Sequence, residues 1–368
     1  MTTPKTNLFT PHTLQGIQLR NRFVRSATLE AMCDLDGHPK ESLIDCYRQL
    51  AAGGCGLLIS GFTYVAQSGK LFPTGLGAAS DEHLAGLKNI AAAVHQEGGA
   101  FCLQLAHAGG QGSKRVCGQQ PLAPSAIKLE QYSREPQEMT PADIEGVVAA
   151  FAAAAGRAKQ AGCDAIQLHA AHGYLINQFL SPLTNQRQDS YGGDLTGRSR
   201  FQLEIVSAIQ QAVGNDFPLL VKLNGSDNLD GGLDIDESIE VAKLLDAAGI
   251  AGIEISSGTP ASGDRSPIRL AHKSGDEMAY NVLLSRTIKQ HVSCPVIVVG
   301  GIRSLHVSTG LLRTNQADYI SLSRPLIREP DLPNKLQSGV SEKSTCISCN
   351  GCLSAILKSE LRCVVPYD

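Results

Sequence analysis

Two histidines and a tyrosine follow a short apolar segment in the middle of the chain. His169 and His172 lie three residues apart, directly after the segment 165–168, and Tyr174 comes next. Imidazole and phenol groups can donate hydrogen bonds or transfer protons, and imidazole can also bind a metal. Paired histidines also occur as hydrogen-bonded structural groups, so the spacing alone leaves these alternatives open. An apolar strand that ends in such groups is nevertheless typical of an active-site rim.

A second candidate site lies near the end of the chain. Gly300 and Gly301 close one apolar segment, and Ser323 and Arg324 close the next. Backbone amides exposed at a glycine-containing turn, together with a guanidinium group, can bind an anion such as phosphate. The alternative is an ordinary tight turn, with Arg324 paired to an acidic residue at the surface.

Four cysteines cluster near the C-terminus. Cys346, Cys349 and Cys352 form a CxxCxxC motif, and Cys363 follows. Close thiolates with a more distant fourth are typical ligands of a [4Fe–4S] cluster and less often of zinc, and free thiols are the alternative. The N-terminus lacks the apolar region of a signal peptide, so we expect a cytoplasmic protein, in which disulfides are rare.

Eight short apolar segments alternate with helical patterns, and this alternation predicts the fold. The segments are 23–27, 56–61, 101–106, 165–169, 219–223, 252–256, 296–300 and 319–323. Such units predict parallel strands joined by helices, and eight of them predict a closed (β/α)8 TIM barrel. An open doubly wound sheet is the alternative, but the first strand lacks a Gly-rich dinucleotide motif. In a barrel the active site lies where the strands end, which is where both histidines lie.

Several local signals support this organisation. Ser80, Thr140 and Asp234 are the predicted N-caps of helices. Residues 8–20 are predicted to form a short N-terminal hairpin. The connections 109–139 and 258–279 are long and should shape the pocket.

Composition narrows the class of protein. A hydrophobic content of 42% over 368 residues is typical of an α/β enzyme. The net charge of −3 gives no reason to expect nucleic acid or an anionic membrane surface as a partner, and no apolar run is long enough to span a bilayer. We expect a barrel over 1–337 and a Cys-rich C-terminal extension over 338–368. A homo-oligomer is compatible with the sequence.

Motifs along nearly the whole chain resemble the old yellow enzyme group of FMN-dependent NAD(P)H oxidoreductases. They are NLFTPHTLQGIQLRNRFVRSA, LQLAHAGG, PLAPSAI, HAAHGYLINQFLSPLTNQRQDSYGG with RSRF, and VVGGIRS with SRPLIREP. The resemblance implies that FMN lies over the strand ends. Its phosphate would lie at Gly300, Gly301, Ser323 and Arg324.

The resemblance also implies contacts with the flavin ring. Gln104 would bond to the pyrimidine edge, and Lys222 would lie beside N1 and O2, where a cation favours the anionic reduced flavin. Ala27, Thr28 and Gly61 would supply backbone or small side-chain contacts.

The resemblance gives the histidines and Tyr174 roles in alkene reduction. His169 and His172 would donate hydrogen bonds to the carbonyl oxygen of an α,β-unsaturated substrate, and Tyr174 would give a proton to its α carbon. NAD(P)H would be the reductant. A metal at the histidines is disfavoured, because no acidic third ligand lies nearby in the sequence.

The sequence departs from the family pattern at Leu29, where many relatives carry Cys or Thr against flavin O4 and N5. The apolar Leu29 cannot donate to O4. The tail resembles the trimethylamine dehydrogenase and 2,4-dienoyl-CoA reductase branch, whose members add further flavin- and nucleotide-binding domains. We expect this chain to end at Asp368 without them.

Three functions remain as hypotheses. The first is an ene-reductase acting on a small unsaturated carbonyl compound. The second is an Fe–S/FMN subunit of an amine dehydrogenase or an enoyl- or dienoyl-CoA reductase, which exchanges electrons with a partner flavoprotein. The third is a barrel that only binds ligands. Arg265 and Arg269, after the sixth strand, are predicted to be solvated loop charges, and contact with an anionic substrate group is the alternative.

Overall fold

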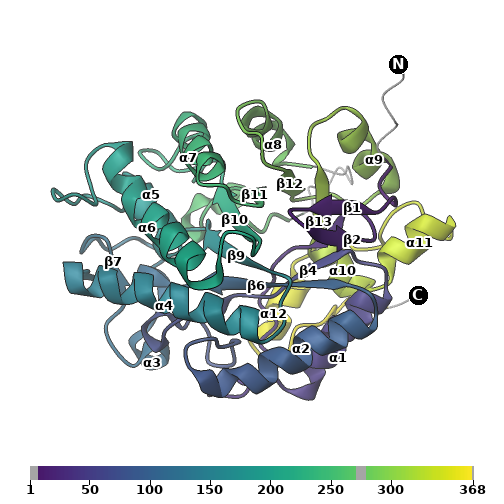
Figure 1. Ribbon diagram of the computed structural model, residues 1–368, viewed down its shortest axis with the longest axis horizontal. Helices are drawn as coiled ribbons and strands as arrows, with labels where there is room; N and C mark the ends of the chain where they lie inside the picture. The colour runs from purple at the N-terminus through teal and green to yellow at the C-terminus, as the bar shows by residue number, and fades with distance from the viewer. Residues whose placement is uncertain (1–6, 271–278, 367–368) are drawn as a thin grey trace.

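Eight parallel strands close into a barrel in the computed structural model, which describes residues 7–270 and 279–366 (Figure 1). The strands are β3 (Phe23–Arg25), β4 (Leu57–Ile59), β6 (Ala100–Ala106), β9 (Ala165–Ala170), β10 (Leu219–Asn224), β11 (Gly252–Ser256), β12 (Val296–Val299) and β13 (Tyr319–Leu322). Each pairs with the next, and β13 pairs with β3, which closes the ring. The short β5 (Thr63–Tyr64) extends alongside β6. The predicted (β/α)8 barrel is therefore confirmed, and the open-sheet alternative is wrong.

The strand register brings polar side chains of neighbouring strands to the same level. Lys222 on β10 lies opposite His169 on β9 and opposite Glu254 on β11. Gln104 on β6 lies opposite Gln167 on β9. These residues are all buried in mostly apolar strands. Because buried polar groups must find partners, hydrogen bonds and ion pairs connect this row of side chains inside the barrel.

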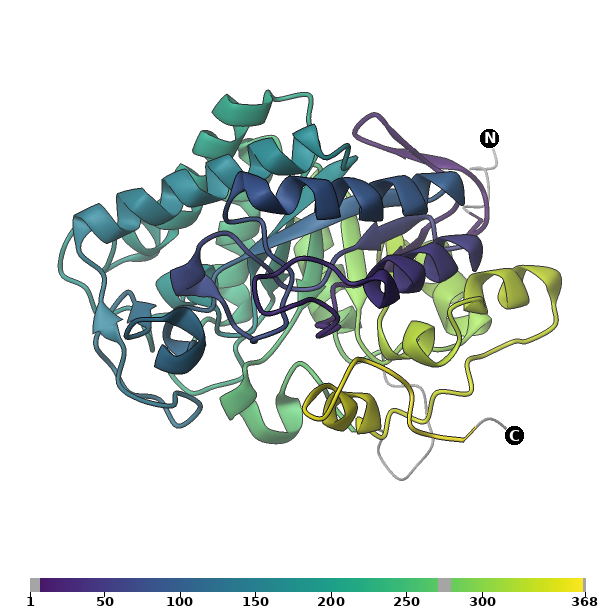
Figure 2. The ribbon, with the colours of Figure 1, turned by 90° about the horizontal axis from the view of Figure 1, so that it is seen from below.

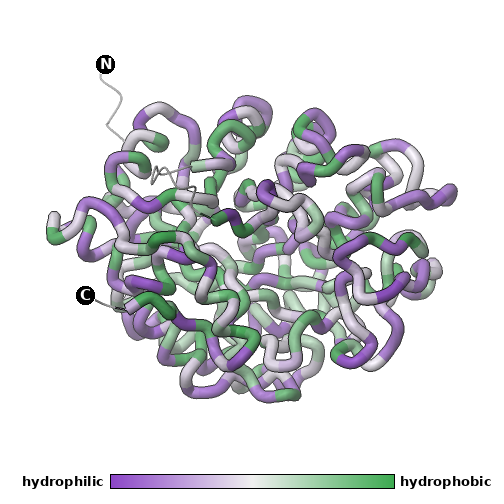
Figure 3. Tube along the Cα trace, turned by 180° about the vertical axis from the view of Figure 1, so that it is seen from behind, coloured by the Kyte–Doolittle hydropathy of each residue, from purple (hydrophilic) through white to green (hydrophobic). Residues whose placement is uncertain are grey.

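Helices surround the barrel and bury their apolar faces against it. They are α1 (Glu41–Ala52), α2 (Leu84–Gln96), α4 (Pro141–Gln160), α6 (Leu195–Val213), α7 (Ile235–Ala247), α8 (Val282–Lys289), α9 (Leu305–Arg313), α10 (Arg324–Arg328) and α11 (Leu332–Ser338). Hydrophilic segments lie mainly toward the outside (Figure 3). The strands form the inner layer and the helices the outer layer, as in other barrel enzymes, and one hydrophobic core lies between them.

The predicted helix starts are largely confirmed. The Thr140 side chain accepts from the backbone N–H of Asp143, and that of Asp234 accepts from Glu237. Such caps stabilise a helix by about 1 kcal/mol. Ser80 instead precedes the 3-10 turn η2 (Asp81–His83), one turn before α2 begins.

A hairpin closes the end of the barrel where the strands begin. It consists of β1 (His12–Leu14) and β2 (Ile17–Leu19), which pair antiparallel as predicted. Leu14 and Leu19 pack with Val24 and Tyr319 in a separate apolar cluster. This end is therefore filled with side chains, so a ligand site must lie at the opposite end.

Two long connections and the C-terminal tail cover that opposite end. The connection after β6 contains η3 (Gly109–Gln111), α3 (Lys114–Cys117), β7 (Leu122–Ala123) and β8 (Gln137–Glu138), and the connection after β11 contains η4 (Pro260–Arg265). Part of the second predicted loop, 271–278, lies outside the described residues. Figure 2 shows the tail with α12 (Gly351–Ile356) beside the η4 connection, and Asn350 Nδ2 donates to the Ile268 carbonyl at 3.3 Å.

The tail begins immediately after α11, close to the predicted boundary at 337/338, and the division into two domains stays a prediction. Among the described residues, every helix is too short or too polar to cross a membrane.

Candidate active site

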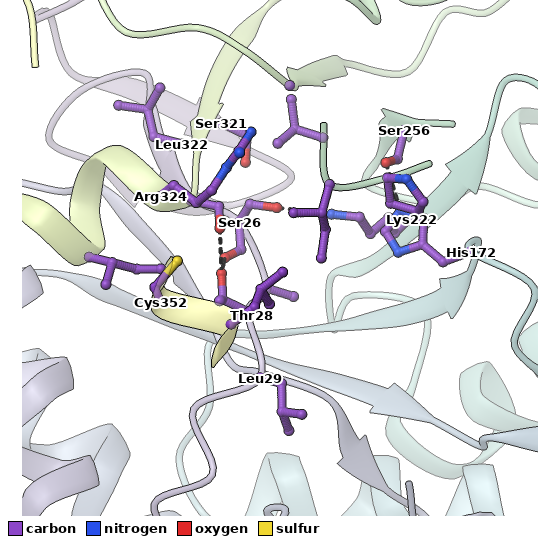
Figure 4. A pocket seen from close by; sticks show the side chains of 18 of the residues that line it. Ser26, Thr28, Leu29, His172, Lys222, Ser256, Ser321, Leu322, Arg324 and Cys352 are labelled. Atoms are coloured by element: carbon purple, nitrogen blue, oxygen red, sulfur yellow. Dashed lines mark hydrogen bonds between the residues drawn. The ribbon is translucent and has the colours of Figure 1, made fainter. Parts of the chain in front are cut away.

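A cavity of about 510 Å³ opens at the carboxyl ends of the barrel strands (Figure 4). It is lined by predicted site residues from six different strands or the segments that follow them: Ala27, Thr28, Gln104, His169, His172, Tyr174, Lys222, Gly300, Gly301, Ser323 and Arg324. The volume is in the usual range for cofactor and substrate sites. The structure thus brings together residues that are far apart in the sequence.

Gly61 is the one predicted flavin contact that does not line this cavity. Its backbone packs so closely that a Cβ would lie 2.1 Å from Oε2 of Glu30 and 2.4 Å from the carbonyl of Thr28. Glycine is required there for this close approach. Its contact with a flavin stays a prediction.

Aromatic rings form the rim of the cavity. The His169 ring meets that of His172 with centroids 5.0 Å apart and that of Tyr174 at 4.8 Å, both edge to face. Phe62 completes the group at 5.0 Å from Tyr174. Edge-to-face contacts of this kind restrain the rings, so the phenol and the imidazoles are held in fixed orientations.

Burial keeps the rim groups neutral. It lowers the pKa of His169 and of His172 well below the usual 6.5, and the charge of Lys222 lowers both further. Burial raises the pKa of Tyr174 to about 12. At neutral pH the rim therefore offers neutral imidazoles and a protonated phenol, which can donate hydrogen bonds without carrying charge.

The hydrogen bonds of His169 indicate which ring nitrogen carries its proton. The backbone N–H of Ala171 donates to Nδ1 of His169 at 3.4 Å. Nδ1 is therefore the acceptor, and Nε2 of this neutral ring must carry the proton. His172 differs, because its Nε2 lies 2.7 Å from the hydroxyl of Ser256, which can be donor or acceptor.

The floor of the cavity holds a buried ion pair. Nζ of Lys222 lies 3.2 Å from Oε2 of Glu254 and donates to the hydroxyl of Ser26 at 2.9 Å. Figure 4 shows Lys222 extending toward Ser26. Next to this pair, Gln104 donates from Nε2 to Oε1 of Gln167 at 2.8 Å. A cation and an amide thus lie on one face of the cavity.

The far end of the cavity has the character of an anion site. Gly300 and Gly301 follow β12 with φ of 120° and 74°, a conformation that favours glycine, and a Cβ on Gly300 would lie 2.5 Å from the ring of Tyr280. The hydroxyl of Ser323 lies 2.8 Å from that of Thr28. Arg324 lines the same end. The residues present fit a phosphate.

The carbonyl of Arg269 and the side chain of Asn350 hold Arg324 in place. Nη1 of Arg324 donates to the Arg269 carbonyl at 2.6 Å and to Oδ1 of Asn350 at 2.5 Å. The prediction that Arg269 is solvated is wrong, because its guanidinium is half-buried, stacks 4.2 Å from the Tyr280 ring and donates to Ser257. Arg265 is exposed, as predicted.

The four tail cysteines line one small cavity of about 20 Å³, next to Arg324 and Arg328. Burial raises the pKa of the Cys346 and Cys352 thiols. Over residues 7–270 and 279–366, however, no three His, Cys, Asp or Glu side chains are placed so that they could hold a metal ion. The conformation described here therefore does not form the predicted cluster site, and the [4Fe–4S] or zinc role of these cysteines stays a prediction.

Some residues of the site could not be identified from the sequence. Ser26 lines the floor, Glu254 and Gln167 lie fully buried beneath it, and Phe62 and Ser256 contact the two histidines. The usable signal is the charged Glu254 within the apolar strand GIEIS. Leu29 does line the cavity, which agrees with its place in the family pattern.

Three histidines whose pKa values are lowered by burial should make stability depend on pH. The pKa of His107 is lowered by burial to about 4, and those of His169 and His172 also lie well below 6.5. In the unfolded chain each takes up a proton near pH 6.5, whereas in the folded protein each stays neutral. The stabilisation is therefore complete above about pH 6.5 and is lost as pH falls toward the folded pKa, by up to about 1.4 kcal/mol per pH unit for each histidine.

Urea unfolding between about pH 7 and pH 5 measures this dependence. His107→Gln removes one of the three histidines, so the free energy of unfolding should fall less steeply with decreasing pH, by the contribution of that one histidine. A free energy of unfolding that stays constant over this interval would contradict the assignment of neutral buried rings.

Comparisons with known proteins agree with this geometry. A family model described as NADH:flavin oxidoreductase / NADH oxidase family matches residues 7–343. The chain is 37% identical to an NADH oxidase of Thermoanaerobacter brockii, over 97% of this chain and 55% of that protein. It is 38% identical to an NADPH dehydrogenase of Geobacillus sp. (strain WCH70), over 89% of this chain and 93% of that protein.

A solved structure shows the same architecture. A 2-naphthoyl-CoA reductase in complex with 2-naphthoyl-CoA superposes with a TM-score of 0.91 at 30% identity, over 98% of this chain and 57% of that one. The chain therefore spans little more than half the length of some relatives and nearly the whole length of others.

Proposed function

Because the chain belongs to the NADH:flavin oxidoreductase / NADH oxidase family, the old yellow enzyme group, it is an oxidoreductase, and we propose that it uses NAD(P)H and bound FMN to reduce the activated C=C bond of α,β-unsaturated carbonyl compounds. FMN, when bound, supplies a hydride acceptor and donor at N5. The whole-protein activity is a proposal, since relatives such as the NADH oxidase are nearly twice as long.

One observation carries the proposal: the cavity combines three kinds of recognition in one space. Its far end offers Gly301 and Arg324 to a phosphate, its floor offers Lys222 and Gln104 to a polar ring edge, and its rim offers His169 to a substrate. A flavin nucleotide is a long ligand with an anionic end and a polar ring edge. The arrangement therefore fits FMN with a substrate held under the rim.

The rim residues would act on the substrate oxygen and on its α carbon. Neutral imidazole donors, such as Nε2–H of His169, stabilise the negative charge that develops on a carbonyl oxygen when its β carbon accepts hydride. Tyr174 would then give its proton to the α carbon. Because the pKa of this phenol is about 12, it would release the proton only as carbanion charge develops on that carbon. Phe62 and the long connections would limit access of water to this space.

A stopped-flow experiment tests the proposal. The purified full chain, loaded with FMN, should be yellow, lose its colour with NAD(P)H and recover it when cyclohexenone is added. Comparison of NADH with NADPH in the same experiment would identify the reductant. A reduced protein that cyclohexenone does not reoxidise would rule out the ene-reductase.

The second candidate is a role in electron exchange, with an acyl-CoA or an amine as substrate. It is favoured by the four tail cysteines around one small cavity and by the similarity to 2-naphthoyl-CoA reductase. The described geometry does not form a metal site, so no electron step is assigned to these thiols. Iron and acid-labile sulfide analysis of protein prepared without air separates the candidates, because full NAD(P)H-dependent alkene reduction without iron would exclude the second.

A further inference from the structure

A fully buried carboxylate lies beneath the floor of the cavity, beside the lysine that we place next to the flavin. Glu254 is 0% exposed, and its Oε2 lies 3.2 Å from Nζ of Lys222. The hydroxyls of Ser26 and Ser321 both donate to its Oε1 at 2.7 Å. Lys222 also donates to Ser26 at 2.9 Å, so the cation, the hydroxyl and the carboxylate form one closed network.

This carboxylate is ionised. Burial raises the pKa of Glu254, but the charge of Lys222 and the hydrogen bonds from Ser321, Ser26 and Gln167 together lower it below its usual value. The directions of the hydrogen bonds agree, since every partner donates to one of the two carboxylate oxygens. Lys222 and Glu254 therefore form a pair with no net charge.

The same carboxylate sets the direction of the hydrogen bonds that lead to Gln104. An ionised carboxylate only accepts, so Gln167 turns its Nε2 toward Glu254, at 3.0 Å. Oε1 of Gln167 then accepts from Nε2 of Gln104. Gln104 keeps its own Oε1 as an acceptor, which suits the N3–H donor of a flavin pyrimidine ring.

We infer that Glu254 is a positioning residue that lowers the reduction potential of the bound flavin by balancing the charge of Lys222. The inference rests on the proposed function, because it requires Lys222 to face FMN. A flavin that accepts a hydride gains one proton and two electrons and so carries one additional negative charge. An unbalanced cation at N1 and O2 would stabilise that charge strongly, and a cation already paired with Glu254 stabilises it less.

The midpoint potential of the FMN-loaded full chain tests this inference, measured by equilibrium reduction against a reference dye. Glu254→Gln should increase the equilibrium constant for two-electron reduction at least tenfold. This corresponds to a rise of about 30 mV in the midpoint potential. Glu237→Gln is the matched control, because Glu237 pairs with the buried Arg198 on the helices outside the barrel. Its potential should equal that of the wild type.

A second background shows whether the effect acts through Lys222. In Lys222→Met the carboxylate of Glu254 would be buried without a cation and should take up a proton. Adding Glu254→Gln there should then change the equilibrium constant less than about twofold. Glu254→Met, which is also unbranched and uncharged, serves the same comparisons if the glutamine variant does not fold.

The outcomes separate this inference from the proposed function. The inference is overturned if Glu254→Gln leaves the potential unchanged or lowers it, or if it raises the potential equally in the Lys222→Met background. The proposed function still holds in that case, provided that the wild type binds FMN and reduces the alkene. A wild-type protein that binds no FMN overturns both.

Discussion

Replacing Tyr174 with phenylalanine is expected to slow reoxidation of the reduced enzyme by cyclohexenone about 10²–10⁴-fold, the usual contribution of a general acid. The pKa of Tyr174 is about 12, so the phenol holds its proton at neutral pH and can give it to the substrate. Phenylalanine keeps the ring contacts with His169 and Phe62, at 4.8 and 5.0 Å, and removes only the hydroxyl. Reduction by NAD(P)H, which needs no proton from this phenol, should keep its rate.

Single-turnover absorbance measurements separate these two half-reactions. Ferricyanide, which accepts electrons without a proton from the enzyme, should reoxidise the variant and the wild type equally. Tyr319→Phe is the control, because Tyr319 lies at the hairpin end of the barrel, where its hydroxyl bonds His12. Wild-type reoxidation of Tyr174→Phe by cyclohexenone would remove Tyr174 as the proton donor.

The barrel could be predicted from the sequence because each of its strands is a short apolar segment closed by turn or polar residues. All eight segments proved to be strands, with ends shifted by at most two residues. The rim and the phosphate end were predictable for the same reason. In a barrel the carboxyl ends of all strands lie on the same side. His169 and Arg324 therefore line the same end of the barrel, regardless of how the core packs.

Lys222 and Gln104 were predicted, but their buried partners could not be, because those partners depend on strand register. Glu254 stands out in the sequence as a charge in an apolar strand, but its partner is set by the pairing of β11 with β10, which places Lys222 opposite it. A shift of one residue would have turned the carboxylate to the other face of the strand. Phe62 was missed for a similar reason, since it lies in the turn between β4 and β5, where no periodicity shows which way a side chain points.

His169→Ala should lower kcat/KM for cyclohexenone about 10²–10³-fold, or about 2.7–4 kcal/mol in the activation free energy, as expected for the loss of one donor to a developing oxyanion. Nδ1 of His169 accepts from the Ala171 backbone, which leaves Nε2–H as the donor for the substrate oxygen. Because the ring is buried and neutral, its hydrogen bond strengthens as negative charge develops. The loss should therefore appear mainly in kcat.

Three comparison variants sharpen this prediction. His169→Asn keeps a donor and should retain more activity than His169→Ala. His172→Ala should lose less than His169→Ala, because Nε2 of His172 is already engaged with Ser256. His107→Gln, a buried histidine outside the cavity lining, should keep the wild-type kcat. A His169→Ala enzyme within about fivefold of wild type in kcat/KM, while its FMN content is unchanged, would show that the substrate oxygen is held elsewhere on the rim.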